Sequence, residues 1–193
     1  MKRVYIVHGW GGSPSEPHIS WIQKRAEEKG FSAVALEMPN SENPVIEKWV
    51  DALKSGVKNP DQNTYFIGHS IGGQAIMRYL MTLPEEIKVG GVIFLAGWFV
   101  LENLEDEKAE QIAKPWVETP INFESLRRRT GHYVAILSDN DPWVSLATNK
   151  ELFEKNLSAQ IIVEHNRGHY TEDDGVTEVL VVIEELVKIS AAS

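Results

Sequence analysis

Residues 64–73 read TYFIGHSIGG, in which a serine lies between glycines at the end of an apolar run. The run Thr64–Ile67 has the β-branched and aromatic residues of a buried strand. Apolar residues then recur on one face of a helix, at Ala75, Ile76, Tyr79 and Leu80. A strand, a sharp turn and a helix form the context in which the pattern G-x-S-x-G presents a serine hydroxyl as a nucleophile. We therefore interpret Ser70 as a nucleophile in preference to a serine that only caps a helix.

Five other short apolar runs have the character of strands. They lie at Val4–Val7, Ala33–Met38, Gly91–Ala96, Tyr133–Ser138 and Gln160–Glu164. Several are near-continuous runs of Val, Ile, Phe and Leu, which is typical of strands covered on both faces of a parallel sheet. Amphipathic segments separate the runs, and this alternation implies right-handed crossovers. The sequence therefore predicts an α/β fold with a minimal six-stranded, mostly parallel, doubly wound sheet and helices on both faces.

Helix-period segments between the strands indicate where helices begin. Pro17 is expected to begin the first helix, and Asn43 and Pro44 are expected to cap and begin the second. Thr171 and Asp174 resemble a capping box at the start of the last helix. The apolar stripe that this last helix is expected to bury is Val176, Val179, Leu180, Ile183 and Val187.

The alternation of strands and helices lapses once, between residues 97 and 130. This segment contains an acidic run at 102–110 and two prolines, Pro115 and Pro120. It is too long for a plain connection, so we expect it to contain a helix and to form a short cap-like insertion. The chain 1–193 is otherwise expected to be a single domain, which suits its length and its content of 42% hydrophobic and 24% charged residues.

Composition excludes several classes of function. The chain has no cysteine, which rules out disulfides, thiolate metal sites, iron–sulfur clusters and a cysteine nucleophile. The formal net charge of −9 argues against sequence-independent binding to nucleic acid or to anionic lipid. No apolar stretch approaches the roughly 20 residues that span a bilayer, so we expect a cytoplasmic protein without a membrane span. The oligomeric state stays open between a monomer and a small homo-oligomer.

A nucleophilic serine needs a histidine base and an acid that orients this base. Asp141 follows the fifth predicted strand and His169 follows the sixth, in the chain order that the G-x-S-x-G turn predicts. Asp139 is the alternative acid, although it is better placed to cap the turn that begins at Asp141. A metal site is not expected, because Gly168 interrupts any helix between His165 and His169.

The carbonyl oxygen of a substrate needs hydrogen-bond donors when negative charge develops on it. We expect one donor from the backbone N–H of Ile71, immediately after the serine. The second is expected from the backbone N–H of Trp10, in the glycine-rich loop after the first strand. His8 in the same loop is better explained as a hydrogen-bonding residue that holds the loop than as a catalytic group.

Other residues in these loops are candidates for contact with a substrate. Aromatic side chains there fit an apolar acyl or alcohol pocket, although core packing explains buried aromatic residues more often. The substrate-binding candidates are His8, Gly9, His69, Trp98, Trp116 and Trp143. The chain has no phosphate-binding glycine loop, so no nucleotide or other cofactor is expected.

Taken together, these residues resemble the α/β-hydrolase superfamily. More narrowly, the chain is similar to the small serine hydrolase family that includes the bacterial YdeN proteins and vertebrate retinoblastoma-binding protein nine. The likeness is carried by residues 4–9, His18, Trp21, Met38-Pro39-Asn40, Trp49, the elbow at 68–70, the Asp141 turn and Gly168-His169. It implies a hydrolase core that lacks the first antiparallel strands of the superfamily, with a triad at Ser70, Asp141 and His169. The chain departs from the common Asp-x-x-Val-Pro turn, because Ser145 replaces the proline.

The leading hypothesis is a carboxylesterase-like serine hydrolase without a cofactor. It would cleave small carboxylic esters through a Ser-His-Asp triad and an acyl-enzyme intermediate. The same triad also cleaves amide and peptide bonds, so an amidase or peptidase is an alternative. A non-enzymatic protein-interaction module on a hydrolase fold is a second alternative.

Overall fold

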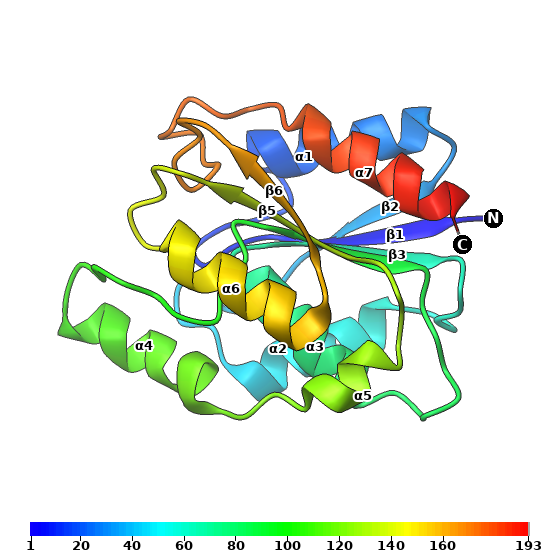
Figure 1. Ribbon diagram of the computed structural model, residues 1–193, viewed down its shortest axis with the longest axis horizontal. Coiled ribbons are helices and arrows are strands. Elements are labelled where there is room, and N and C mark those ends of the chain that lie inside the picture. Colours follow the sequence, from blue (N-terminus) through cyan, green and yellow to red (C-terminus); the bar gives the residue numbers. More distant parts are fainter. Residues whose placement is uncertain (193) are drawn as a thin grey trace.

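The computed structural model describes residues 1–192 and contains a parallel sheet of six strands (Figure 1). The order across the sheet is β2-β1-β3-β4-β5-β6, and every neighbouring pair is parallel. The strands are β1 Arg3–Val7, β2 Ser32–Leu36, β3 Thr64–His69, β4 Gly91–Leu95, β5 Tyr133–Ser138 and β6 Gln160–Glu164. Each coincides with a predicted run to within one or two residues at either end. The predicted sheet is therefore confirmed, and its pairing is parallel throughout.

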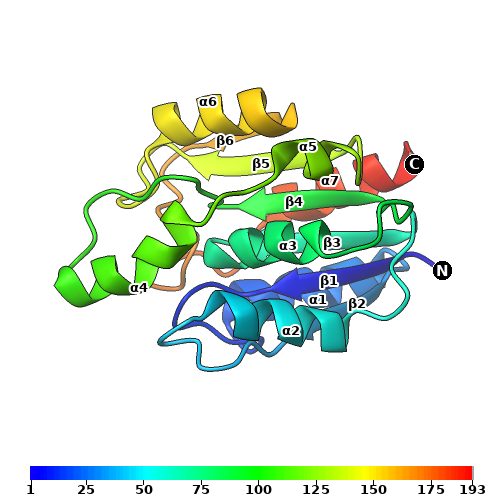
Figure 2. The same ribbon diagram turned by 90° about the horizontal axis from the view of Figure 1, so that it is seen from below.

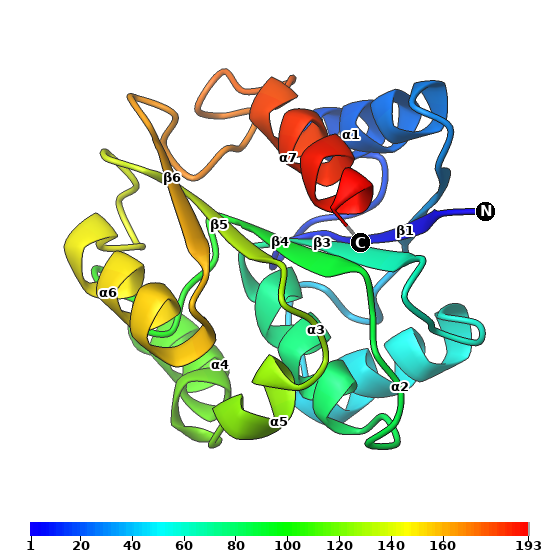
Figure 3. The same cartoon turned by 45° about the vertical axis from the view of Figure 1, so that its right-hand side comes forward.

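Helices cover both faces of the sheet (Figure 3). One face carries α1 Pro17–Glu28 and α7 Leu180–Ala191, and the other carries α2 Ile46–Gly56, α3 Ile71–Met81, α5 Phe123–Arg127 and α6 Leu146–Leu157. Successive residues of β1 feed the two cores, because side chains alternate along a strand. Val4 and Ile6 pack with α1 and α7, whereas Tyr5 and Val7 pack with α2 and α3.

The second helix begins later than the sequence predicts. Asn43 and Pro44 precede the helix, which starts at Ile46. The carbonyl oxygen of Pro44 accepts a hydrogen bond from the indole N–H of Trp116 at 3.0 Å, so it is engaged by the insertion rather than by a helical amide. The first intrahelical bond is instead accepted by the carbonyl of Val45.

The last helix also begins later, at Leu180, so Thr171 and Asp174 do not cap it. Oδ2 of Asp174 accepts hydrogen bonds from the amides of Thr171 at 3.0 Å and His169 at 2.9 Å, which closes a turn of its own. The buried face of α7 also differs in part from the predicted one. Leu180 is 60% exposed and Val187 is 39% exposed, so the prediction that these two residues are buried is wrong. The side chains that α7 buries are Val182, Ile183, Glu185, Leu186, Ile189 and Ser190.

The segment 97–130 contains α5 and a longer helix, α4 Glu107–Glu118. Figure 2 shows α4 beyond the carboxyl ends of the strands. Its C-terminal end is tied to α3 by the buried guanidinium of Arg78, which donates to the carbonyls of Trp116 at 2.7 Å and Thr119 at 3.1 Å. The ring of Trp116 lies under the same guanidinium, with 5.5 Å between Cζ and the ring centroid. The insertion is thus anchored at the edge of the sheet where ligands of parallel sheets bind.

Candidate active site

Ser70 lies in the turn between β3 and α3, in a strained backbone conformation. Its φ of 51° and ψ of −122° lie in a region that residues with a side chain rarely adopt. The chain also passes close to itself here. A Cβ at Gly68 would lie 2.5 Å from the amide nitrogen of Gly73, and one at Gly72 would lie 2.4 Å from the carbonyl oxygen of Val7. Both glycines of the G-x-S-x-G pattern are therefore required by close approach.

His169 and Asp141 form a buried pair. Nδ1 of His169 lies 2.7 Å from Oδ2 of Asp141, whose side chain is only 1% exposed. The other carboxylate oxygen accepts hydrogen bonds from the amides of Trp143 and Val144, both at 3.0 Å. A carboxylate held in this way can only accept from the ring, so Nδ1 carries a proton and the neutral imidazole keeps its lone pair on Nε2. Nε2 is the nitrogen that can act as a base.

Asp139, the alternative acid, lies away from His169. Its carboxylate pairs with Nδ1 of His165 and accepts a hydrogen bond from the amide of Asn166. The hydrogen bond from His165 is the main cause that lowers the pKa of Asp139. The expectation that Asp139 caps the following turn is wrong, because Asp141 bonds the amides of that turn itself.

Ser70 and His169 line the same cavity, and each is only 7% exposed. The Oγ of Ser70 accepts a hydrogen bond from Nε1 of Trp98 at 3.3 Å. Within residues 1–192 no hydrogen bond joins the side chains of Ser70 and His169. Catalytic hydrogen bonds are often loose in unliganded sites and tighten when substrate binds.

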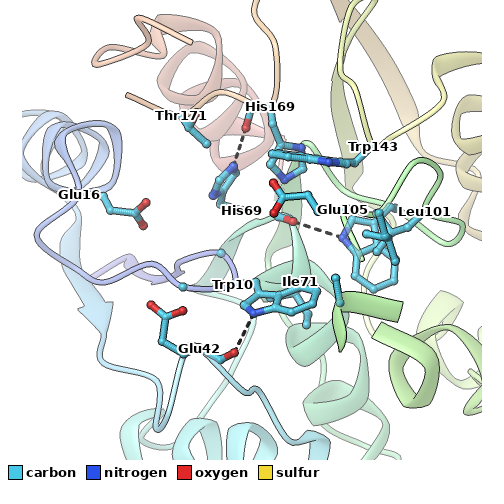
Figure 4. Close-up of a pocket in the computed structure, with 16 residues that line it drawn as sticks. Trp10, Glu16, Glu42, His69, Ile71, Leu101, Glu105, Trp143, His169 and Thr171 are labelled. Atoms are coloured by element: carbon cyan, nitrogen blue, oxygen red, sulfur yellow. Dashed lines mark hydrogen bonds between the residues drawn. The ribbon is translucent and has the colours of Figure 1, made fainter. Parts of the chain in front are cut away.

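The loop after β1 passes over the elbow and brings Trp10 to the cavity (Figure 4). A Cβ at Gly9 would lie 2.9 Å from Nδ1 of His69, so the loop can approach this closely only with glycine. Nε1 of Trp10 donates to the carbonyl oxygen of Glu42 at 3.0 Å and anchors the loop. In the part of the chain that is described, neither the amide of Trp10 nor that of Ile71 donates a hydrogen bond. Trp10 and Ile71 both line the cavity, and their amides stay the predicted oxyanion donors.

Two of the predicted substrate-binding residues do not reach the cavity. His8 is fully buried, and its ring accepts a hydrogen bond from the amide of Met38 at Nε2 and bonds the carbonyl of Gly9 through Nδ1. Burial lowers its pKa. His8 therefore holds the loop, as expected from the sequence, and its assignment as a substrate contact is wrong. The prediction that Trp116 contacts a substrate is also wrong. Its ring is buried between the insertion and α2, where it makes an edge-to-face contact with Trp49.

The cavity has a volume of about 330 Å³ and opens at the carboxyl edge of the sheet (Figure 4). Four of the residues predicted to contact a substrate line it, namely Gly9, His69, Trp98 and Trp143. Sequence reasoning missed several other residues of the wall, namely Gly11, Glu16, Glu42, Leu101, Leu104, Glu105, Ala109 and Thr171. Leu101, Leu104, Glu105 and Ala109 belong to the insertion, which therefore forms part of the cavity wall.

The mouth of the cavity is acidic. Glu16, Glu42 and Glu105 line it, and none of the described lining residues is a lysine or arginine. Glu42 and Glu105 are exposed, whereas Glu16 is half-buried and its burial raises the pKa of its carboxyl group. The field of these carboxylates disfavours anionic ligands relative to neutral or cationic ones.

Comparison with known proteins identifies the family. Residues 4–187 match the family described as serine hydrolase. The chain belongs to the serine hydrolase family. This serine hydrolase is 30% identical to YdeN of Bacillus subtilis over 185 residues, which cover 96% of this chain and 94% of YdeN. It is 26% identical to the serine hydrolase RBBP9 of Rattus norvegicus over 172 residues, 87% of each chain.

The fold of this serine hydrolase is that of the crystal structure of the B. subtilis ydeN gene product. The two superpose with a TM-score of 0.90 at 28% identity, covering 99% of this chain and 100% of the other. The resemblance inferred from the sequence and the predicted α/β-hydrolase fold are thereby confirmed. Among residues 1–192, no helix has the length and apolar character needed to cross a membrane.

Proposed function

We propose that this serine hydrolase cleaves small carboxylic esters, with Ser70 as nucleophile, His169 as base and Asp141 as the acid that orients it. The observation that carries the proposal is the hydrogen bond of 2.7 Å between Nδ1 of His169 and Oδ2 of Asp141, on the wall of the cavity that also contains Ser70. A serine hydroxyl is a weak nucleophile until such a pair accepts its proton. Membership of the serine hydrolase family supports the same reaction class.

In the proposed reaction Oγ of Ser70 attacks the ester carbonyl while Nε2 of His169 takes the hydroxyl proton. The amides of Trp10 and Ile71 donate hydrogen bonds to the oxyanion of the tetrahedral intermediate. The imidazolium then returns the proton to the alcohol, which leaves as the C–O bond breaks and the acyl-enzyme remains. Water, deprotonated by His169, attacks the acyl carbonyl, and Oγ leaves and recovers its proton.

The cavity supports a small substrate. Its volume of about 330 Å³ is near the lower end of the range of roughly 300–1,000 Å³ for ligand pockets. Apolar side chains from three segments line it: Trp98 and Leu104 from the insertion, Trp143 after β5, and Trp10 after β1. Such a wall favours a short acyl or alcohol group over a polymer chain.

The proposal is tested with p-nitrophenyl acetate and butyrate. The variant Ser70→Ala is expected to lose about 10⁶-fold in kcat, because the acyl-enzyme cannot form. Ser20→Ala removes an exposed serine hydroxyl on α1 and serves as the matched control. If Ser70→Ala turns over these esters as fast as the parent, the assigned nucleophile is wrong.

A fluorophosphonate probe distinguishes the remaining alternatives. The parent chain is expected to be labelled at Ser70, located by mass spectrometry of the labelled peptide. Labelling together with hydrolysis of anilides but not esters would favour the amidase alternative. Absence of labelling in a folded parent chain would contradict the enzymatic proposal and favour an interaction module.

A further inference from the structure

His69, the residue directly before the proposed nucleophile, is bonded to the proposed base. Its ring is buried, and Nε2 lies 2.8 Å from the main-chain carbonyl oxygen of His169 (Figure 4). A carbonyl oxygen can only accept, so Nε2 of His69 carries a proton. This bond joins the end of β3 to the loop after β6, across one hundred residues of sequence.

A second buried histidine lies behind the first. Nε2 of His18, on α1, is 3.4 Å from Nδ1 of His69, and the two rings meet edge-on with centroids 4.7 Å apart. With the proton of His69 on Nε2, its Nδ1 is an acceptor, so Nε2 of His18 is the donor. The remaining nitrogen, Nδ1 of His18, is buried and has no hydrogen-bond partner in residues 1–192.

Both histidines are neutral in the folded chain. Burial is the largest cause that lowers the pKa of His69 well below its usual value, and it lowers that of His18 to about 4. The neutral state matters because the rings of His69 and His169 are 5.2 Å apart. A positive charge on His69 would oppose the imidazolium that His169 forms during catalysis.

The opposite side of the His169 main chain is held as well. Its amide donates to Oδ2 of Asp174 at 2.9 Å, and the same oxygen accepts from the amide and the hydroxyl of Thr171. The residues on either side, Gly168 and Tyr170, have φ values of 53° and 62°. The main chain of His169 is thus held on one side by His69 and on the other by Asp174, while its ring is held by Asp141.

We propose that His69, backed by His18, is a positioning residue for His169. Its Nε2–H holds the main-chain carbonyl of the base, so that the segment carrying the nucleophile also fixes the base. The inference rests on the proposed function, because it takes Ser70 and His169 as partners in the reaction. A shift of about 1 Å in the position of a catalytic base can lower the rate about 100-fold. Loss of the single bond with which His69 holds the main chain of His169 can therefore have a measurable effect on kcat.

Two variants separate positioning from packing. His69→Gln places an amide N–H near the position of Nε2 and is expected to keep kcat within about threefold of the parent, since the bond can still form. His69→Leu fills a similar volume without a donor and is expected to lower kcat about 10- to 100-fold with little change in KM. Val182→Ala, on the buried face of α7, controls for a general loss of stability. Equal kcat values for folded Gln and Leu variants would overturn the proposal.

The parent chain provides a test that needs no variant to fold. Histidine labelled with ¹⁵N is expected to show His69 as the neutral Nε2–H tautomer from pH 6 to 8, with a cross-peak pattern that distinguishes the two ring nitrogens. An Nδ1–H tautomer or a charged ring would contradict the proposed bond. Fluorophosphonate labelling of the same sample separates the two proposals: labelling of Ser70 with the wrong tautomer rejects only the role of His69, whereas the expected tautomer without labelling rejects the proposed function.

Discussion

The indole Nε1 of Trp98 lies 3.3 Å from Oγ of Ser70 and donates a hydrogen bond to it. Trp98 follows β4 and is 1% exposed, so the indole is fixed by the core rather than free to turn away. The main-chain carbonyl of Trp98 accepts a hydrogen bond from the side chain of Gln74 on α3, and this bond also fixes the position of Trp98. One lone pair of Oγ is therefore engaged by the indole of the insertion, while the O–H of Ser70 remains free to donate.

This bond weakens when Oγ attacks a carbonyl, because an ester oxygen is a poorer acceptor than a hydroxyl oxygen. Trp98→Phe keeps an aromatic ring but removes the donor, so we expect acylation of Ser70 by a fluorophosphonate to become about two- to tenfold faster, the equivalent of a neutral hydrogen bond worth about 0.5–1.5 kcal/mol. Trp116→Phe is the matched control, because its indole donates to the carbonyl of Pro44, away from the serine. A slower labelling rate in Trp98→Phe alone would mean that the indole assists the reaction instead.

The pair of aspartates after β5 provides a second test. Asp141→Asn removes the charge that supports the imidazolium and favours the wrong ring tautomer, so kcat for p-nitrophenyl butyrate is expected to fall by about 10⁴-fold. Asp139→Asn breaks the contact with His165 and is expected to leave kcat unchanged. Steady-state kinetics of the two variants side by side decide between the acids. A larger loss in Asp139→Asn would reverse the assignment.

The turn at Ser70 and the positions of Asp141 and His169 after their strands can be predicted from the sequence, because they depend on local chain geometry and on the order of the strands. A Cβ at Gly68 or Gly72 would lie less than 3 Å from nearby backbone atoms, so glycine is required at both positions. The two glycines mark this constraint in the sequence. The order of Asp141 and His169 along the chain follows from strands that alternate with helices. These features need no knowledge of how distant segments pack.

The wall of the cavity could not be predicted in the same way. Leu101 and Leu104 lie before α4 in an irregular segment, where no periodicity marks which side faces the site. Trp98 and Trp116 are both tryptophans of the insertion, and nothing in the sequence distinguishes their roles. Tertiary packing places Trp116 against Trp49 on α2, whereas the indole of Trp98 bonds the serine. The helix α7 starts later than the sequence predicts, because Asp174 bonds the amides of Thr171 and His169 in a separate turn that precedes it.

The carboxylates at the cavity mouth, which the sequence did not reveal, predict charge selectivity. At low ionic strength kcat/KM is expected to be higher for a choline ester than for the 3,3-dimethylbutyl ester, in which carbon replaces the quaternary nitrogen. Glu105→Gln is expected to reduce this ratio by about two- to fivefold, since exposed charge pairs are worth about 0.2–1 kcal/mol. Added salt should reduce the ratio in the parent. Glu86→Gln changes an exposed carboxylate between α3 and β4 and should leave the ratio unchanged.

The buried histidines predict how stability depends on pH. Burial lowers the pKa of His18 from 6.5 to about 4, so between these values the unfolded chain binds a proton that the folded chain does not. The contribution of neutral His18 to the free energy of unfolding is therefore fully present above about pH 6.5 and is lost as the pH falls towards 4. The contribution of His18 is at most about 3 kcal/mol, at 1.36 kcal/mol per pH unit. The free energy of unfolding, measured in urea at pH 7 and pH 5, should fall less steeply in His18→Gln than in the parent. His132→Gln, which leaves the buried histidines in place, should keep the parental slope; an identical slope in His18→Gln would show that His18 does not remain neutral in the folded chain.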